Sequence, residues 1–203
     1  MSLWAIVPVK ALHESKSRLR DVLTPVRRVE LTREMLLNTL QELAEVPEIE
    51  RTLVVSADST VLALAQERGA EVIEERGSPS LNKALNQATA IASERQAEAV
   101  LILPADLPLL QAADVRDLIG RAQEPPVVLV SPDRKRSGTN ALFVAPPGTI
   151  EYEFGPDSFE RHIQRAEASG ARVEIIELPT LGLDLDAPED LEIYQDRIAL
   201  IKE

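Results

Sequence analysis

Short apolar runs recur along the chain and alternate with longer segments in which apolar residues follow a helical spacing. The first run is Trp4–Val9 (WAIVPV), and similar runs follow at Arg51–Ser56 and Ala99–Leu103. Between the first two runs, the segment Val26–Ala44 carries apolar side chains every three to four residues, which is the period of an amphipathic helix. Alternating strands and helices predict a mostly parallel sheet with helices on both faces.

The same criteria divide the rest of the chain into elements. The predicted strands are Trp4–Val9, Arg51–Ser56, Ala70–Ile73, Ala99–Leu103, Val127–Ser131, Thr139–Val144 and Arg172–Leu178, and the predicted helices are Val26–Ala44, Ser59–Arg68, Ser80–Ala97, Ala112–Ala122, Asp157–Ser169 and Pro188–Ile201. The loop between the fifth and sixth strands is too short for a crossover helix, so we expect this pair to be antiparallel. No repeat or linker interrupts the pattern, which favours a single domain over residues 1–203.

Composition narrows the class of protein. Apolar residues make up 44% of the chain, enough for one sizeable core, and no run approaches the roughly 20 apolar residues of a membrane span. The start, MSLWAIVPVK, has no charged region followed by an apolar one, so we expect no signal peptide. The absence of cysteine excludes thiol catalysis, thiolate metal sites and disulfides, and it fits a cytoplasmic protein.

The net charge of −12 disfavours nonspecific binding to nucleic acid or to an anionic membrane, so neither is expected as a partner. Residues 10–33 depart from this balance, with seven Lys or Arg against three acids, a local charge of +4. Such a basic island indicates a site for a small polyanion. A solvated helix face is the alternative interpretation.

The loop after the first strand contains no glycine, because the first glycine of the chain is Gly69. A dinucleotide fingerprint or a Walker loop is therefore excluded there, since both need glycines for close backbone approach to phosphates. In their place stand cations, at Lys10, Lys16, Arg18 and Arg20, after Pro8. Lysine and arginine side chains could hold a triphosphate directly, although a surface loop with scattered cations has the same pattern.

Carboxylates stand in two distant segments that we expect at the ends of strands. Asp106 follows the run Ala99–Leu103 between two prolines, where a turn cap is the alternative. In the segment LGLDLDAPED, an extended backbone would place Asp184 and Asp186 on one face. Asp186 also fits the N-cap of the last helix. Ligands bind at the carboxyl ends of strands in open α/β sheets, so converging carboxylates there could hold a divalent cation.

Two further loops indicate a second, smaller pocket for an acidic ligand. Residues 132–140 (PDRKRSGTN) carry three cations and end in a small Gly-Thr-Asn stretch. In FGPDSF, Gly155 and Ser158 stand at the start of a predicted helix, where backbone N–H groups favour an anion. A simple helix cap by Asp157 or Ser158 is the alternative.

Together these segments resemble the nucleotidyltransferases of coenzyme F420 biosynthesis, the phosphoenolpyruvate / 2-phospho-L-lactate guanylyltransferase family. The combination of SPDR…GTN with FGPDSF is the most specific part. Related molybdenum-cofactor and sugar nucleotidyltransferases carry a glycine-rich first loop, which this chain lacks. The matching segments, in order, are VPVK with KSRL, VVSAD, LNKAL, ADLPLL, SPDRKRSGTNAL, FGPDSFERH and LDLDAPEDL.

The resemblance implies a single-domain α/β fold of the glycosyltransferase-A-like type and transfer of GMP from GTP to the phosphate of a small phosphorylated acid, with Mg²⁺ and release of diphosphate. We expect phosphoenolpyruvate as the acceptor ahead of 2-phospho-L-lactate and 3-phospho-D-glycerate. The oligomeric state is open, a homodimer included. A molybdenum-cofactor guanylyltransferase-like enzyme and a non-catalytic nucleotide-binding protein are the alternatives.

The resemblance also implies roles for individual residues. Metal binding falls to Asp106 with the Asp184/Asp186 pair, and the catalytic groups are Asp106, Lys16 and Lys10. The nucleotide would meet Pro8, Lys10, Lys16 and Arg18, with Asn82 near the base, and the phosphorylated acid would meet Thr139, Gly155 and Ser158. The acceptor phosphate is itself the nucleophile, so no cysteine or catalytic histidine is needed.

Overall fold

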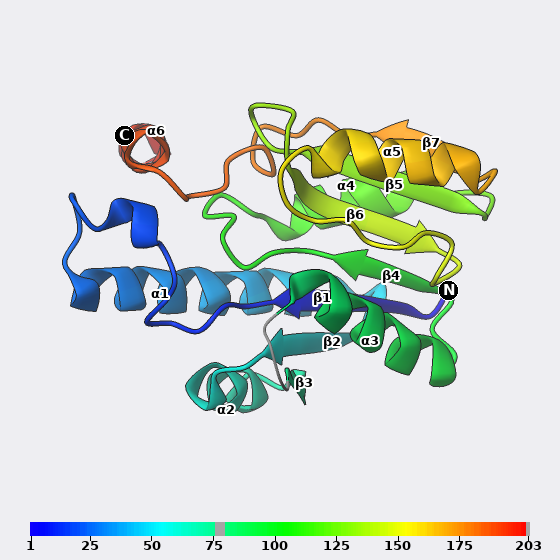
Figure 1. The fold of residues 1–203 in the computed structure, drawn as a ribbon, viewed down its shortest axis with the longest axis horizontal. Helices are drawn as coiled ribbons and strands as arrows, with labels where there is room; N and C mark the ends of the chain where they lie inside the picture. The colour runs from blue at the N-terminus through cyan, green and yellow to red at the C-terminus, as the bar shows by residue number, and fades with distance from the viewer. Residues whose placement is uncertain (76–79, 202–203) are drawn as a thin grey trace.

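The fold is built on one seven-stranded sheet (Figure 1), in a computed structural model that describes residues 1–75 and 80–201. The strand order is β3-β2-β1-β4-β6-β5-β7, and β6 alone runs antiparallel to its neighbours β4 and β5. The strands are β1 (Leu3–Pro8), β2 (Ile49–Ser56), β3 (Glu71–Glu74), β4 (Ala99–Ile102), β5 (Val127–Pro132), β6 (Thr139–Ala145) and β7 (Arg172–Ile175).

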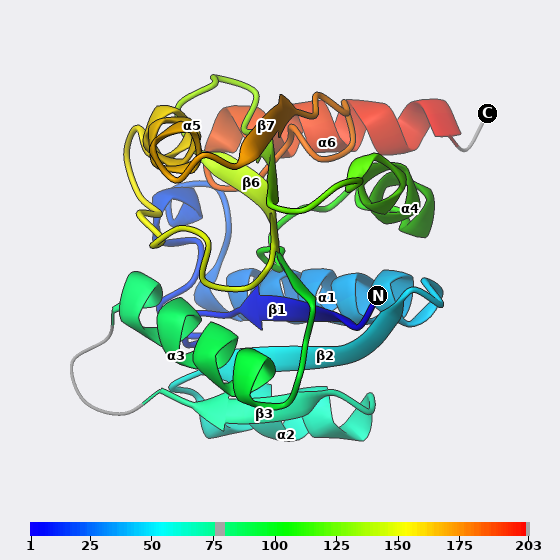
Figure 2. The same ribbon diagram turned by 90° about the vertical axis from the view of Figure 1, so that its right-hand side faces the viewer.

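Helices cover both faces of the sheet, as the alternating pattern predicts (Figure 2). One face packs against α1, α2 and α4, and the other packs against α3 and α5. The helices are α1 (Pro25–Ala44), α2 (Ser59–Glu67), α3 (Leu81–Glu94), α4 (Ala112–Arg121), α5 (Ser158–Ala168) and α6 (Pro188–Ile201), and a short 3₁₀ turn, η1, spans Ser17–Leu19.

The predicted elements are confirmed, with shifts of a few residues at their ends, and so is the antiparallel pair β5–β6. The helix α1 begins at Pro25, one residue before its predicted start. Thr24 is its N-cap, with the hydroxyl 3.3 Å from the backbone nitrogen of Arg27, and Pro25 occupies the first turn. Within the described residues, no helix has both the length and the apolar character to cross a membrane.

The segment from Leu181 to Asp186 is not a strand, which corrects the expectation of a carboxylate at a strand end there. The alternation itself is real, because Leu181, Leu183 and Leu185 are buried while the residues between them are partly exposed. The segment passes over the end of the sheet, where the backbone N–H of Leu185 donates to the carbonyl of Asp106 (3.0 Å). This bond brings the two distant acidic segments together.

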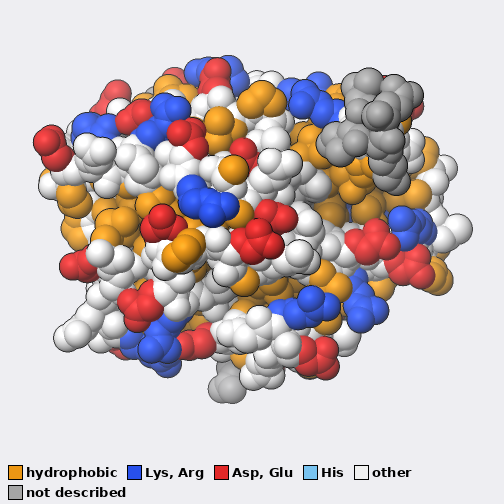
Figure 3. All heavy atoms as spheres, turned by 180° about the vertical axis from the view of Figure 1, so that it is seen from behind, with side chains coloured by type: hydrophobic (Ala, Val, Ile, Leu, Met, Phe, Trp, Pro, Cys, Tyr) orange, Lys and Arg blue, Asp and Glu red, His pale blue; other side chains and the backbone are white. Residues whose placement is uncertain are grey.

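Part of the basic island is an ordinary helix surface, as the alternative interpretation held. Arg27 on α1 pairs with Glu30 and Glu34 of the same helix, at 3.3 and 3.0 Å, and is half exposed. On the face of the molecule seen in Figure 3, basic and acidic side chains are likewise interspersed in small groups. The cations that matter for a polyanion site are therefore the ones in the first loop.

Candidate active site

A cavity of about 590 Å³ opens at the carboxyl ends of the central strands β1 and β4. Open α/β sheets bind their ligands at the carboxyl ends of the strands. The cavity brings together most of the candidate residues from the sequence, namely Pro8, Lys10, Lys16, Arg18, Asp106, Thr139, Gly155, Ser158, Asp184 and Asp186. The first loop, the Asp106 segment and the 181–186 segment thus contribute to one wall.

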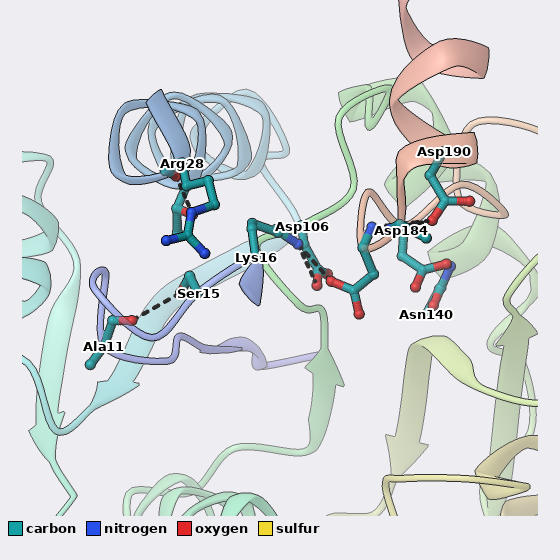
Figure 4. A network of polar contacts seen from close by, with 11 residues as sticks. Ala11, Ser15, Lys16, Arg28, Asp106, Asn140, Asp184 and Asp190 are labelled. Carbon is teal, nitrogen blue, oxygen red and sulfur yellow. Dashed lines mark hydrogen bonds and ion pairs between the residues drawn. The ribbon is translucent and has the colours of Figure 1, made fainter. Parts of the chain in front are cut away.

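Lys16 lies at the centre of the acidic part of the cavity (Figure 4). Its Nζ is 3.2 Å from Oδ2 of Asp106 and 3.0 Å from Oδ1 of Asp186, and its side chain is only 4% exposed. Burial alone would lower the pKa of Lys16, but the two carboxylates raise it above its usual value. Lys16 is therefore a fixed positive charge between the two carboxylates.

The carboxylates differ in their electrostatic surroundings. Burial, together with repulsion from Asp106, raises the pKa of Asp184 to about 6. Burial acts on Asp186 in the same sense, but Lys16, supported by Lys10 and Arg18, holds the pKa of that carboxyl below its usual value. The negative charge of Asp186 is thus compensated by Lys16, whereas the side chain of Asp184 accepts from the neutral Asn140 amide at 3.5 Å.

Asp186 does not serve as the N-cap of α6, which corrects one of the interpretations of the sequence. Its carboxylate is bound to Lys16, and the capping role belongs to Asp190. Oδ2 of Asp190 accepts from the backbone N–H groups of Asp186 (3.2 Å) and Ala187 (2.8 Å), while Oδ1 binds Arg134 at 2.9 Å. Asp190 therefore fixes the backbone that carries Asp186.

The donor set suits Mg²⁺ in its chemistry, since it consists of carboxylates. Asp106 and Asp186 converge on one ammonium group, so a single cation can already reach both. Among residues 1–75 and 80–201, no three His, Cys, Asp or Glu side chains are close enough to form a complete metal cage. Mg²⁺ commonly takes one or two carboxylates and completes its shell with substrate phosphates and water, so the arrangement fits a metal that arrives with a nucleotide.

Another part of the cavity wall carries hydroxyl groups. Ser158 at the start of α5 is 1% exposed and donates to Oγ1 of Thr139 at 3.3 Å, and Thr139 is 2.9 Å from Nδ1 of the buried His162. Gly155 precedes the helix with φ of +131°, a conformation that residues with a side chain rarely adopt. Asp157 occupies the N-cap position but its side chain makes no cap hydrogen bond, so the simple cap interpretation is wrong for this residue.

Asn82 has a different environment from the one expected for a base-contacting residue. Its Nδ2 donates to the carbonyl of Phe154 (3.2 Å) and its Oδ1 accepts from the Phe154 backbone N–H (2.8 Å). Both ends of the amide are thus used to hold the loop before Gly155 against α3. The neighbours of Asn82 that do line the cavity are Ser80, Leu81 and Ala84.

Sequence reasoning treated Arg28 only as part of the basic island. In the structure its side chain extends from α1 toward the loop that carries Ser15 and Lys16 (Figure 4). Its Nε is buried, and within the described part of the chain it has no hydrogen-bond partner. Buried polar nitrogens are normally paired, so the Arg28 Nε is an exception, and Arg28 is not among the residues that line the cavity. An arginine one turn inside a helix, beside a basic loop, is the only sequence signal for it.

The fold is shared with solved nucleotidyltransferases. A nucleotidyltransferase from Methanothermobacter thermautotrophicus superimposes with a TM-score of 0.70 at 13% identity, covering 98% of this chain and 99% of that one. A putative nucleotide-diphospho-sugar transferase from Desulfovibrio desulfuricans gives a TM-score of 0.77 at 16% identity, covering 95% of this chain and 86% of that one. The chain thus has the glycosyltransferase-A-like α/β fold that the sequence resemblance implied.

Sequence comparison identifies the family within this fold. The family described as "Guanylyl transferase CofC like" matches residues 3–195, and the chain belongs to it. The phosphoenolpyruvate guanylyltransferase of Rubrobacter xylanophilus is 47% identical over 191 residues, 94% of this chain and 92% of that protein. The 2-phospho-L-lactate guanylyltransferase of Methanothermobacter thermautotrophicus is 36% identical over 191 residues, 94% of this chain and 83% of that protein.

Proposed function

We propose that the protein transfers GMP from GTP to the phosphate of phosphoenolpyruvate and releases diphosphate. Beyond membership of the family, one observation carries the proposal: Lys16, Asp106 and Asp186, from three distant segments, meet at the ligand-binding edge of the sheet. This constellation supplies charge for a triphosphate and a cation, and the hydroxyl-lined part of the cavity supplies a place for a second, smaller ligand.

The chemistry needs no protein nucleophile. An oxygen of the acceptor phosphate attacks the α-phosphorus of GTP, a new P–O bond forms there, and the bond from the α-phosphorus to the bridging oxygen breaks. The bridging oxygen keeps the electron pair and leaves as part of diphosphate. Since the attacking phosphate is already ionised, the protein contributes position and charge neutralisation rather than proton transfer.

Cations of the first loop neutralise the triphosphate. Lys10 and Arg18 line the cavity and act electrostatically on Asp186, so both lie within reach of a ligand bound there. Lys16 adds a buried charge whose pKa is raised. Together these groups take up the negative charge that accumulates on the leaving diphosphate.

Asp106 and Asp186 would hold Mg²⁺ together with substrate phosphates, with Asp184 nearby as a further negative charge, and the bound ion would neutralise the phosphate oxygens and polarise the α-phosphorus. Burial and repulsion from Asp106 raise the pKa of Asp184, and this supports the role, because a divalent cation would relieve the repulsion. Thr139, Gly155 and Ser158 would hold the phosphorylated acid. The high identity to a phosphoenolpyruvate guanylyltransferase favours phosphoenolpyruvate over 2-phospho-L-lactate.

The direct test is incubation with GTP, Mg²⁺ and each of phosphoenolpyruvate, 2-phospho-L-lactate and 3-phospho-D-glycerate, with product mass and diphosphate release as readouts. We expect a GMP adduct of phosphoenolpyruvate, and loss of turnover on chelation of divalent cations that added Mg²⁺ restores. Stabilisation by GTP without diphosphate release would indicate a nucleotide-binding protein instead. Product from another nucleotide or acceptor only would indicate a different nucleotidyltransferase.

The variant Asp106→Asn should lower turnover by about 100-fold or more, because it removes a charge that faces both Lys16 and the phosphates. Its matched control is Asp196→Asn, at an exposed position on α6 away from the cavity. Circular dichroism should show both variants folded. Near-normal turnover in Asp106→Asn would refute the assignment of this carboxylate.

A further inference from the structure

His162 is a buried histidine that no step of the reaction uses. It is 0% exposed, lies on α5 behind the cavity wall, and packs edge-on against the ring of Phe154 at 4.7 Å between centroids. Burial lowers its pKa from 6.5 to about 4, so the ring is neutral at physiological pH. A neutral imidazole has one nitrogen that donates and one that accepts, and the neighbours decide which is which.

The neighbours of His162 fix the position of its proton. The backbone N–H of Glu153 points at Nε2, with 3.1 Å between the nitrogens, so Nε2 must accept. The proton therefore resides on Nδ1 and is donated to Oγ1 of Thr139 at 2.9 Å. Backbone amides cannot change from donor to acceptor, so this direction is dictated by the fold.

The hydrogen-bond partners of Thr139 likewise fix the direction of its hydroxyl. Its oxygen accepts from Nδ1 of His162 and from the hydroxyl of Ser158 at 3.3 Å, which uses both of its lone pairs. Only the hydroxyl proton is left, and in residues 1–75 and 80–201 no side chain or backbone group accepts it. Thr139 is 5% exposed and lines the cavity, so that proton is available to a ligand there.

We propose that His162 is a positioning residue that, through Thr139, presents a hydrogen-bond donor to an ionised oxygen of the phosphorylated acid. The inference rests on the proposed function, since it assigns the acid to the hydroxyl-lined wall. In this arrangement the hydroxyl-lined wall can only donate a hydrogen bond at Thr139. Thr139 donates and does not accept, so a carboxylate or phosphate oxygen is matched and a ligand hydroxyl donor is rejected.

Kinetics of four variants test the coupling. His162→Phe keeps a ring but loses the donor, and we expect it to raise the KM for phosphoenolpyruvate about tenfold with little change in the KM for GTP. His162→Asn places an amide N–H near the position of Nδ1 and should restore most of the loss. Ile163→Ala, at the next position of α5, is the control for general loosening of the helix and should leave both KM values nearly unchanged.

The fourth variant distinguishes positioning from a structural role. Thr139→Val keeps the shape of the side chain without the hydroxyl, and in its background His162→Phe should have no further effect on the KM for the acid. Equal, additive losses in the double variant, or parallel losses for GTP and the acid, would overturn the proposal, because they would show that His162 acts independently of Thr139.

A readout without turnover keeps the proposal separable from the proposed function. The chain has two histidines, and the other, His13, has a side chain that is 78% exposed. Nitrogen-15 NMR of the wild-type protein should show His162 protonated on Nδ1 and unchanged from pH 8 to pH 5.5. A proton on Nε2, or titration of His162 near pH 6.5, would overturn the inference. If no acid yields product, the proposed function fails and this spectrum alone decides the state of His162.

Discussion

At the scale of single residues, His162 makes the stability of the protein depend on pH. Burial, with Arg161 and Arg165 nearby, lowers its pKa to about 4, although Glu153 acts in the opposite sense. Between pH 6.5 and about 4, the unfolded chain binds a proton at this position and the native protein does not. The stability contributed by neutral His162 is therefore fully present above pH 6.5 and is lost as the pH falls toward 4.

The variant His162→Asn should lack this dependence. We expect the wild type to lose on the order of 3 kcal/mol more stability than the variant between pH 7 and pH 4, since one pKa unit corresponds to about 1.4 kcal/mol. Urea unfolding at a series of pH values measures the difference. Parallel curves for the two proteins would show that His162 is not held neutral.

Individual site residues were predictable to different extents. Lys16, Asp106, Thr139 and Ser158 stand in segments whose composition and resemblance indicate a site, and the structure brings them to one cavity. His162 lies in a helix with ordinary periodicity, and its importance depends on a backbone amide nine residues away. This contact forms because the loop before α5 folds back onto the helix. No local sequence pattern predicts that conformation.

At the scale of elements, the first turn of α6 controls the position of Asp186. Asp190 is 8% exposed and accepts from two backbone N–H groups ahead of the helix, while Arg134 holds its other oxygen. Removing this carboxylate leaves those donors without a partner, and the backbone that aims Asp186 at Lys16 is released.

We expect Asp190→Ala to lower the free energy of unfolding by about 1 to 3 kcal/mol and to lower turnover at saturating GTP as well. The control is Glu189→Ala, at the exposed neighbouring position of the same turn. Thermal unfolding and diphosphate release measure the two effects. A stable Asp190→Ala variant with normal turnover would show that the turn positions Asp186 without this carboxylate.

Element boundaries followed from sequence wherever periodicity reflects burial against the sheet. The segment from Leu181 to Asp186 shows the limit of that reasoning. Its leucines alternate inward as in a strand, but the chain crosses the end of the sheet and is held there by separate hydrogen bonds, from Leu185 to Asp106 and from Arg134 to Gly182, rather than by a strand ladder. An alternating pattern reports that one side is buried and does not report whether a neighbouring strand is present.

At the scale of the whole molecule, the cavity joins segments from opposite ends of the chain. Lys16 and Asp186 are 170 residues apart in sequence and 3.0 Å apart in space. A ligand that contacts both should stabilise the two segments together. At GTP and Mg²⁺ concentrations 100 times the Kd, we expect amide exchange in residues 10–19 and 181–190 to slow by up to about 100-fold, with β3 little affected.

Hydrogen–deuterium exchange with mass spectrometry checks this coupling. Lys16→Met should weaken the protection at residues 181–190 as well as at its own loop, because the shared ion pairs are lost. Lys83→Met, at an exposed site on α3, serves as the matched control. Protection confined to residues 10–19 in the wild type would mean that the carboxyl-terminal segment does not take part in binding the nucleotide.

The contact between Lys16 and Asp186 also bears on biosynthesis. During translation, Lys16 leaves the ribosome long before Asp186 has been synthesised. A nascent chain that already contains every strand of the sheet still lacks Asp186. Premature termination anywhere before residue 186 would therefore yield a product without this ion pair, however well the remainder folds.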